Sequence, residues 1–469
     1  MPAAHAAGAF ARAALRPLGA ALQVLAVAVP GYLQSRRLAA RSACRCEESG
    51  ARRVLIDTDP GVDDALAILL ALGSQRVSLH GLTIALGNGK DIRDLGSNAK
   101  LLLRLSNAAP VPVSLGDDSL ATSCEGATVS RKGMEKQLVH GEDNLGNVGA
   151  KYGKCDEDYR DFHPLKAPEF IYDVCRRFPG EVSVVCIGPL NNLAEALQQH
   201  PDLPELVREV LIMGGAFGLR RGNRTPAAEA NFYHAPEAAQ AVLTAKFKRV
   251  VVAGLDVTHQ TEMRELRAAC VAAAPGSVIS QFIWDVCETY MNVYHDWGET
   301  VAPAHDVVPI MYLLRPELFE AEEVRVEVET APAALTRGMS IADWKGQWGK
   351  EPNCLVVTQI RDVAAFTAAF VAAMARLPLG VGGLGAVEGL RATGEQSAAR
   401  KDVEYVARFD DAVHKLLGAG KSEKELSETL AKGLAETLRR FQQLVARLPP
   451  EVSWTEADVT SAIRELQIE

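Results

Sequence analysis

Short apolar runs alternate with amphipathic stretches from about residue 54 to residue 375. The apolar runs are rich in β-branched residues, as buried strands are. They cover residues 54–56, 79–86, 182–187, 206–213 and 250–255. Stretches with helical spacing lie between them, and they cover residues 65–72, 98–105, 167–178 and 192–199. Strands that alternate with helices predict an α/β fold, with an open, mostly parallel, doubly wound sheet and helices on both faces.

The pattern changes near the end of this region. Residues 272–297 have the spacing of one long helix, with aromatic side chains along it. Residues 324–329 (VRVEVE) alternate strictly, as a half-buried strand does, and we expect them to pair with residues 355–358 around a hairpin-like annex. The catalytic domain should therefore span residues 51–377.

The two ends of the chain differ from this domain in composition. The first 46 residues contain six arginines and no acidic residue, so residues 1–50 are typical of a mitochondrial or plastid transit peptide. The alternative is a secretory signal or a cytoplasmic protein; the apolar run 18–33 falls short of the ~20 residues that a stable membrane span needs. Residues 378–401 are a Gly-rich linker, and residues 402–469 predict a helical C-terminal extension.

Composition excludes several classes of protein. The chain has 469 residues, 48% of them hydrophobic and 23% charged, which is ordinary for a globular protein. Its net charge of -9 and the lack of a basic run argue against a nucleic-acid partner. The nine cysteines include no CxxC pair, so neither a disulfide framework nor a zinc site is indicated.

Four aspartates crowd the first strand-to-helix turn, in the sequence DTDPGVDDA at residues 57–65. Four like charges repel one another unless something offsets them, and calcium or magnesium takes such oxygen ligands. The positive end of the following helix also favours Asp63 and Asp64. A plain helix cap would explain one aspartate but not four. The turn therefore predicts a metal or substrate site.

Further polar groups follow other strands and loops. Asn223, Glu229 and Asn231 place one carboxylate between two amides, which suits the hydroxyls of a sugar, although cap chemistry would explain Asn223 alone. Tyr290, Tyr294 and His295 lie on an aromatic stripe that is more often core, and they are candidates to face a substrate base. The remaining motifs are GN at 87–88, HGEDNLG at 140–146, IGPLNNLA at 187–194, MGGAF at 213–217 and HDVVP at 305–309.

Taken in order, these motifs resemble the inosine-uridine preferring nucleoside hydrolases over about residues 53–375. The late stretch 336–353 (TRGMSIADWKGQWGKEPN) is also similar to a hairpin of that family. The resemblance implies a Ca²⁺-dependent enzyme that hydrolyses the N-glycosidic bond of a ribonucleoside to free base and ribose. We also expect a homo-oligomer, either a dimer or a tetramer.

The resemblance also implies roles for single residues. Asp59, Asp64 and Asp306 would hold the ion with the backbone carbonyl of Ile187, and Asp59 would be the catalytic base. The ribose would be held by Asp63, Asn88, Asn223, Glu229 and Asn231. His305 would be a general acid on the base side, His140 would contact substrate, and Asp57 would support its neighbours. The sequence departs from the family at Ala230, where an aromatic residue is common, and at Asn144, where glycine is usual. His140 and His305 favour the pyrimidine or mixed-specificity branch.

Two alternatives remain open at this stage. DxDPG after a strand is superficially like the nucleophile motif of haloacid dehalogenase-type phosphatases, but that reading gives Asp63 and Asp64 no role. The second alternative is a catalytically silent relative that binds a nucleoside or serves as a subunit through its helical tail.

Overall fold

The computed structural model describes residues 51–108, 110–117, 139–218 and 222–377. The targeting segment, the linker and the helical extension that the sequence predicts lie outside these residues, so they stay predictions. Across the described ranges, no helix is long and apolar enough to cross a membrane.

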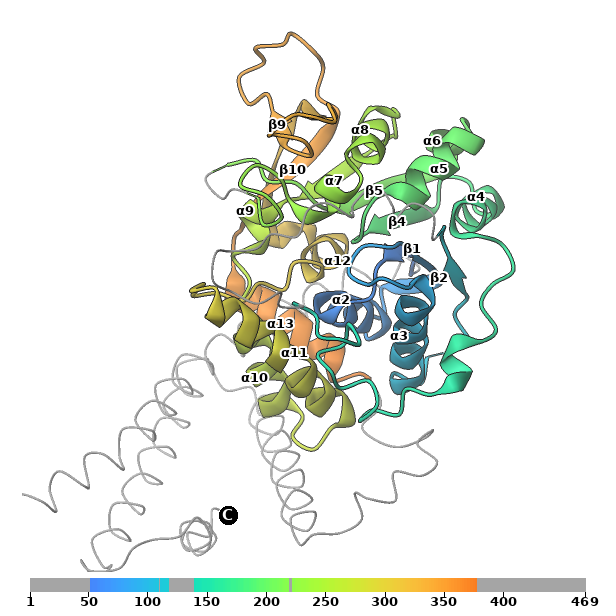
Figure 1. Cartoon of the computed structure of the whole chain (residues 1–469), viewed down its shortest axis with the longest axis vertical. Helices are drawn as coiled ribbons and strands as arrows, with labels where there is room; N and C mark the ends of the chain where they lie inside the picture. Colours follow the sequence, from blue (N-terminus) through green and yellow to red (C-terminus); the bar gives the residue numbers. More distant parts are fainter. Residues whose placement is uncertain (1–50, 109, 118–138, 219–221, 378–469) are drawn as a thin grey trace, which may run out of the picture. The chain divides into compact units, whose positions relative to one another are not determined.

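The central element is an eight-stranded sheet with the strand order β3-β2-β1-β4-β5-β6-β10-β7 (Figure 1). Its paired strands run parallel except for β7, which pairs antiparallel with β10 at one edge. The strands are β1 (Arg52–Thr58), β2 (Val77–Ile84), β3 (Val113–Leu115), β4 (Val182–Cys186), β5 (Val207–Met213), β6 (Val250–Ala253), β7 (Phe319–Val324) and β10 (Cys354–Ile360). The predicted open, mostly parallel α/β sheet is therefore confirmed.

Helices cover both faces of the sheet. Successive side chains of a buried strand point to opposite faces, so each strand contributes to a core on either side. Val54 and Ile56 of β1 pack in one core, and Leu55 packs in the other. The first core contains residues of α2 (Val62–Leu72), α3 (Ile92–Leu105), α9 (Leu255–Thr258), α10 (Met263–Ala273), α11 (Val278–Asp296), α12 (Val307–Leu314) and α13 (Val363–Met374). The second contains residues of α4 (Ala167–Arg177), α5 (Asn191–Gln199), α6 (Leu203–Leu206), α7 (Ala230–His234) and α8 (Pro236–Thr244). Two short 3-10 helices, η2 (Asp156–Tyr159) and η3 (Pro316–Leu318), complete the helical elements.

Helix α2 is buried on all sides from Val62 to Ala71. A helix that is apolar all round must lie inside a protein, and α2 packs among α3, α11, α12 and α13 (Figure 1). Its first turn carries Asp63 and Asp64. Burial of the whole helix therefore fixes these two carboxylates in the interior.

Two predictions near the end of the domain were wrong in detail. The predicted helix 272–297 begins only at Val278, because Gly276 adopts a φ of +77° and separates α10 from α11. Residues 324–329 do not form one strand paired with 355–358. Strand β7 ends at Val324, and β8 (Val326–Val328) pairs with β9 (Ser340–Ala342) instead. Asn353 explains the break, since its side chain bonds both the N–H and the C=O of Val326 at 2.8 Å.

Strand β1 lies between β2 and β4, so the chain leaves β1 in one direction and later returns on its other side. Open α/β sheets bind ligands in the crevice at the carboxyl ends of strands where the order reverses in this way. The Asp59–Asp64 turn follows β1, and Ile187 follows β4. The topology thus brings the two motifs to one sheet edge.

Candidate active site

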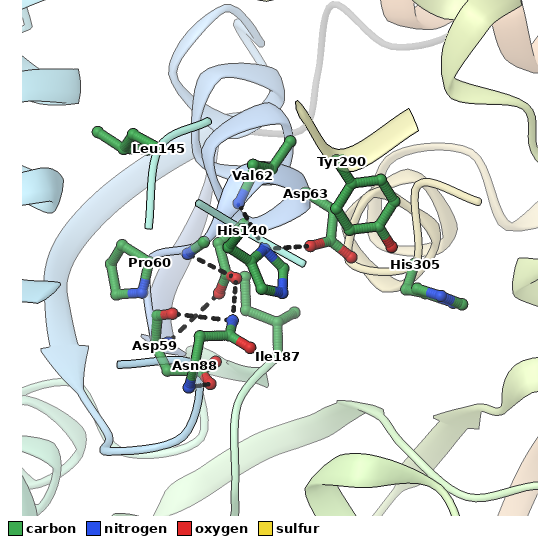
Figure 2. Close-up of polar contacts among 12 residues, drawn as sticks. Asp59, Pro60, Val62, Asp63, Asn88, His140, Leu145, Ile187, Tyr290 and His305 are labelled. Atoms are coloured by element: carbon green, nitrogen blue, oxygen red, sulfur yellow. Dashed lines mark hydrogen bonds and ion pairs between the residues drawn. The ribbon is translucent and has the colours of Figure 1, made fainter. Parts of the chain in front are cut away.

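Five segments bring polar groups to the carboxyl edge of the sheet. They are the turn after β1, Asn88 after β2, Ile187 after β4, the start of α7 with its N-cap residue Glu229, and the start of α12. Figure 2 shows Asp59, Asn88 and His140 on one side of Asp63, with Tyr290 and His305 on its other side. Residues 246 positions apart in the sequence (Asp59 and His305) therefore share one region.

The core of the site is a carboxylate cluster formed by Asp63, Asp64 and Asp306. All three side chains are buried, and each offers an oxygen atom that lies within 4.8 Å of those of the other two. Asp63 and Asp64 come from the first turn of α2. Asp306 is the N-cap residue of α12, yet its side chain accepts no capping hydrogen bond from that helix. Its carboxylate is directed to the cluster instead.

Asp64 is held from three directions. The Thr58 hydroxyl donates to its Oδ1 at 2.5 Å, and the backbone N–H of Gly61 donates to its Oδ2 at 2.9 Å. The side-chain amide of Asn88 also donates to Oδ2, at 3.1 Å. Charge-assisted hydrogen bonds of this kind fix an oxygen in one orientation.

Asp59 lies beside the carboxylate cluster rather than among its three members. Its backbone N–H donates to Asp64 Oδ1 at 3.3 Å, and its own Oδ2 accepts from the backbone N–H of Asn88 at 2.8 Å. A side chain at Gly87 or Gly188 would collide with the Asp59 carboxylate. The two glycines therefore let the exits of β2 and β4 close around Asp59.

Burial of so many carboxylates has a large electrostatic cost. Burial raises the pKa of Asp63 to about 7, and burial together with the charge of neighbouring aspartates raises the pKa of Asp59 and Asp306 well above the usual range. The groups that hydrogen bond to Asp59 and Asp64 are a hydroxyl, backbone N–H groups and an amide, none of which carries a full positive charge. An all-oxygen, buried and uncompensated donor set fits a hard divalent cation.

Asp57 faces away from the carboxylate cluster. Its Oδ1 accepts from the Thr83 hydroxyl at 2.5 Å and from the Asn192 amide at 2.8 Å, which ties β1 to β2 and α5. Among the described residues, its buried Oδ2 has no hydrogen-bond partner. Burial raises the pKa of Asp57 to about 7. Asp57 therefore holds β1 to its neighbours and does not belong to the cluster.

His140 packs against the start of α2 as a neutral ring. The backbone N–H of Val62 donates to its Nδ1 at 3.0 Å, so this nitrogen carries no proton. Burial lowers the pKa of His140 to about 4, in agreement with that role. His140 Nδ1 also lies 3.9 Å from Asp63 Oδ1, but an unprotonated nitrogen makes no ion pair there.

Asn144 and Asn98 explain the local structure of the HGEDNLG loop. Asn144 adopts a φ of +60°, the left-handed region that glycine or asparagine tolerates best, which accounts for the departure from glycine. Asn98 of α3 is fully buried, and its amide donates to the carbonyls of Pro60 and Asp143 at 3.2 and 2.9 Å. Asn98 therefore joins the loop to the aspartate turn.

The predicted ribose residues around the start of α7 already make contacts within the protein. Glu229 is buried, and its carboxylate accepts from the N–H groups of Gly215, Asn231 and Phe232 at 2.8–3.1 Å. Burial raises the pKa of Glu229 to about 6. The Asn231 amide donates to the carbonyls of Ile187 and Met213, at the exits of β4 and β5. Asn223 is exposed and caps the N–H of Ala230 at 2.9 Å.

His305 has a partner at each ring nitrogen. Nδ1 lies 2.7 Å from the Thr258 hydroxyl, and Nε2 lies 3.1 Å from the Tyr294 hydroxyl. The hydroxyls of Tyr294 and Tyr290 are hydrogen bonded at 3.1 Å. Burial is the main reason why the pKa of His305 lies well below its usual value. His295 does not share this environment, because its side chain is 82% exposed.

Sequence reasoning placed Tyr290 and Tyr294 near a substrate base but missed Thr258, Asn98 and Thr58. Asn98 had a readable signal, since it lies among apolar residues on the buried face of α3. Thr258 and Thr58 had none, because a single threonine beside a histidine or an aspartate occurs in many proteins.

The fold and the site together define an α/β enzyme with a buried carboxylate cluster at the switch point of its sheet. The model of the family "Inosine-uridine preferring nucleoside hydrolase" matches residues 54–368. The chain belongs to this family, and it is accordingly a hydrolase of N-glycosyl bonds. This membership disfavours the phosphatase alternative.

Individual relatives agree with this assignment. The chain is 34% identical over 309 residues to the pyrimidine-specific ribonucleoside hydrolase RihA of Citrobacter koseri, a match that covers 66% of this chain and 93% of that protein. Among solved structures, it is similar to the plant nucleoside hydrolase PpNRh1, with a TM-score of 0.60 and 28% identity over 69% of this chain and 98% of that one. It is also similar to a purine-preferring ribonucleoside hydrolase from Gardnerella vaginalis, with a TM-score of 0.59 and 25% identity. That match covers 70% of this chain and 99% of the other.

Proposed function

We propose that this chain is a calcium-dependent ribonucleoside hydrolase that acts on nucleosides of the uridine and inosine type. The observation that carries the proposal is the carboxylate cluster of Asp63, Asp64 and Asp306, buried beside Asp59 at the switch point of the sheet. The similarity to a pyrimidine-specific enzyme supports uridine as a substrate.

The ion would be held by Asp59, Asp64 and Asp306 together with the carbonyl of Ile187. The Ile187 carbonyl already accepts from the Asn231 amide at 3.0 Å, and its second lone pair leaves room for one further bond. A bound Ca²⁺ would offset the carboxylate charge and make a coordinated water easier to deprotonate. Asp63 also belongs to the cluster, and its position next to His140 and Tyr290 suits a contact with the ribose.

Asp59 is the proposed base that takes a proton from the attacking water. Its Oδ2 is fixed by the N–H of Asn88, so its other oxygen has a defined position. Cleavage of the bond between C1' and the base nitrogen builds positive charge on the ribose ring. The surrounding negative groups stabilise that charge, because they are already oriented before the reaction starts.

The ribose hydroxyls would be held by Asp63, Asn88, Asn223, Glu229 and Asn231. Asn88 already bonds Asp59 and Asp64, and Asn231 bonds the exits of two strands, so both are held rigidly at the sheet edge. On the base side, His305 and its tyrosine partners supply hydrogen-bond donors to the departing base. His140 is the neutral ring between these two groups.

The decisive experiment measures free ribose released from a panel of uridine, cytidine, inosine, adenosine and guanosine, with and without a chelator. We expect ribose from uridine or inosine, loss of activity with the chelator and recovery with added Ca²⁺. A phosphomonoester serves as the control substrate. Phosphate release without ribose release would support a phosphatase. Protein that binds calcium but leaves every nucleoside intact would identify a silent relative.

A further inference from the structure

The hydrogen-bond chain from Thr258 through His305 to the two tyrosines depends on where His305 carries its proton. Neutral histidine carries one proton, on Nδ1 or on Nε2, and its neighbours decide which. His305 meets only hydroxyl groups, Thr258 at Nδ1 and Tyr294 at Nε2. A hydroxyl can either donate or accept, so these two contacts alone do not fix the tautomer.

The Leu255 carbonyl removes this ambiguity. Besides the ring nitrogen of His305, the Thr258 hydroxyl has one acceptor within reach, the carbonyl of Leu255 at 3.4 Å. That carbonyl already accepts from the backbone N–H of His259 at 3.1 Å and from His259 Nδ1 at 2.8 Å. A carbonyl oxygen has two lone pairs, and both are therefore engaged at shorter distances. The Thr258 hydroxyl therefore donates its proton to Nδ1 of His305, 2.7 Å away.

We propose that Thr258 is a positioning residue, which donates to Nδ1 of His305 and so holds the proton of that ring on Nε2. This inference rests on the proposed nucleoside hydrolase function and deepens it, because it assigns a part to a residue that touches no substrate. Thr258 is fully buried at the end of α9, and His259 keeps the competing carbonyl occupied.

The tautomer sets the direction of the whole chain. With its proton on Nε2, His305 donates to the Tyr294 oxygen, which also accepts from the Tyr290 hydroxyl at 3.1 Å. Tyr294 then has its own hydroxyl proton for a further acceptor. The Tyr294 ring stacks on the ring of Tyr290, which lies near His140 and Asp63 (Figure 2), the side proposed to hold substrate. Donors aligned in one direction strengthen one another.

This direction serves the departure of the base. When the bond between C1' and the base nitrogen breaks, the electron pair goes to the base, and negative charge develops there. The Tyr294 hydroxyl stabilises that charge by donating a hydrogen bond, while the proton of the attacking water goes to Asp59. The base takes its final proton from solvent after release. With the opposite tautomer, His305 Nε2 would be an acceptor and the Tyr294 proton would be committed to it.

The test compares two kinds of leaving group in Thr258→Val and Thr258→Ser. Uridine and inosine have poor leaving groups that need a donor, whereas p-nitrophenyl β-D-ribofuranoside releases a stable anion without one. We expect Thr258→Val to lower kcat for the nucleosides by about 10²-fold, the lower range for such assistance, and to change p-nitrophenyl riboside hydrolysis by less than about 3-fold. Thr258→Ser keeps the hydroxyl and should restore nucleoside cleavage.

The outcomes separate this inference from the proposed function. If the unchanged enzyme cleaves no nucleoside, the proposed function fails. If it cleaves nucleosides but Thr258→Val slows both substrate types equally, Thr258 is only structural and the inference fails. Nitrogen NMR of labelled histidine gives a readout without activity, with the His305 signals assigned from a His305→Gln sample. The unchanged protein should show His305 protonated on Nε2, and a proton on Nδ1 would overturn the inference even if Thr258→Val does not fold.

Discussion

The backbone N–H of Val62 donates a hydrogen bond to Nδ1 of His140 at 3.0 Å. This contact needs the neutral ring, so protonation of His140 must break it. The folded pKa of about 4 lies below the usual 6.5, and the difference corresponds to about 3 kcal/mol. The contribution to stability is present above pH 6.5 and is lost as the pH falls toward 4.

We therefore expect His140→Gln to lose less stability than the unchanged protein between pH 6.5 and pH 4, by up to about 3 kcal/mol. Glutamine keeps an acceptor for Val62 but does not titrate. Urea unfolding at several pH values measures the difference. His295→Gln is the matched control, because it makes the same substitution at an exposed histidine outside the site. Identical pH profiles for His140→Gln and the unchanged protein would contradict the neutral-ring assignment.

Calcium should raise the melting temperature, since an ion that binds only the folded state stabilises it. Asp306→Asn removes one member of the carboxylate cluster and should abolish most of this shift in a thermal scan with and without Ca²⁺. Asp173→Asn, on the surface of α4, removes the same charge outside the site and should keep the shift. An equal calcium shift in both variants would exclude Asp306 as a ligand.

Asp59→Asn should lower kcat by about 10²–10⁴-fold, the range expected for loss of a general base. The substitution keeps the shape of the side chain and an oxygen for the Asn88 N–H, so the fold should persist. Ribose release measures turnover, and circular dichroism checks the fold. Near-normal turnover in Asp59→Asn would remove Asp59 from the mechanism.

His305→Ala should reduce cleavage of some nucleosides more than others, because bases differ in how much they depend on a donor. Tyr294→Phe interrupts the same chain one step farther along and should show the same order of effects across the substrate panel. The ratio of kcat values between uridine and inosine is the quantity to compare. A uniform loss for all bases would place His305 outside leaving-group activation.

Asn98→Leu should destabilise the protein by about 2–4 kcal/mol, since it leaves two buried carbonyls without their donor. Lys154→Met removes only the cation that donates to the Asn98 oxygen at 2.6 Å, and it should cost less. Denaturant unfolding of both variants gives the comparison. A larger loss for Lys154→Met would show that the ion, not the amide, stabilises the loop.

The strands and the doubly wound sheet were predictable because buried parallel strands have continuous apolar runs, as β4 and β5 do. The ends of elements that are set by a single tertiary contact were not predictable. Nothing local in VRVEVE reveals that Asn353 occupies both backbone groups of Val326 and ends the pairing with β10. Gly276 marked the break before α11, but the apolar period on both sides of it concealed the signal.

At the site, the sequence named candidate residues but could not predict their arrangement. Asp63, Asp64 and Asp306 were all named, but the place of Asp63 in the carboxylate cluster, with Asp59 beside it, depends on how α2 and α12 meet. The burial that sets the pKa values of these groups is likewise a property of the packed fold. The proposed role of Thr258 could not be predicted from the sequence. It depends on the lone pairs of the Leu255 carbonyl, which already accepts from His259.

The aspartate turn follows the first strand, whereas Asp306 comes about 240 residues later and reaches the same place only through α12. Most of the sheet must be assembled before these carboxylates meet. The repulsion that Asp306 adds to the charges of the aspartate turn is therefore absent while the early strands pair, and it arises only when α12 packs onto α2. Refolding should consequently recover strand and helix content first and nucleoside cleavage last, with calcium acting on the final step.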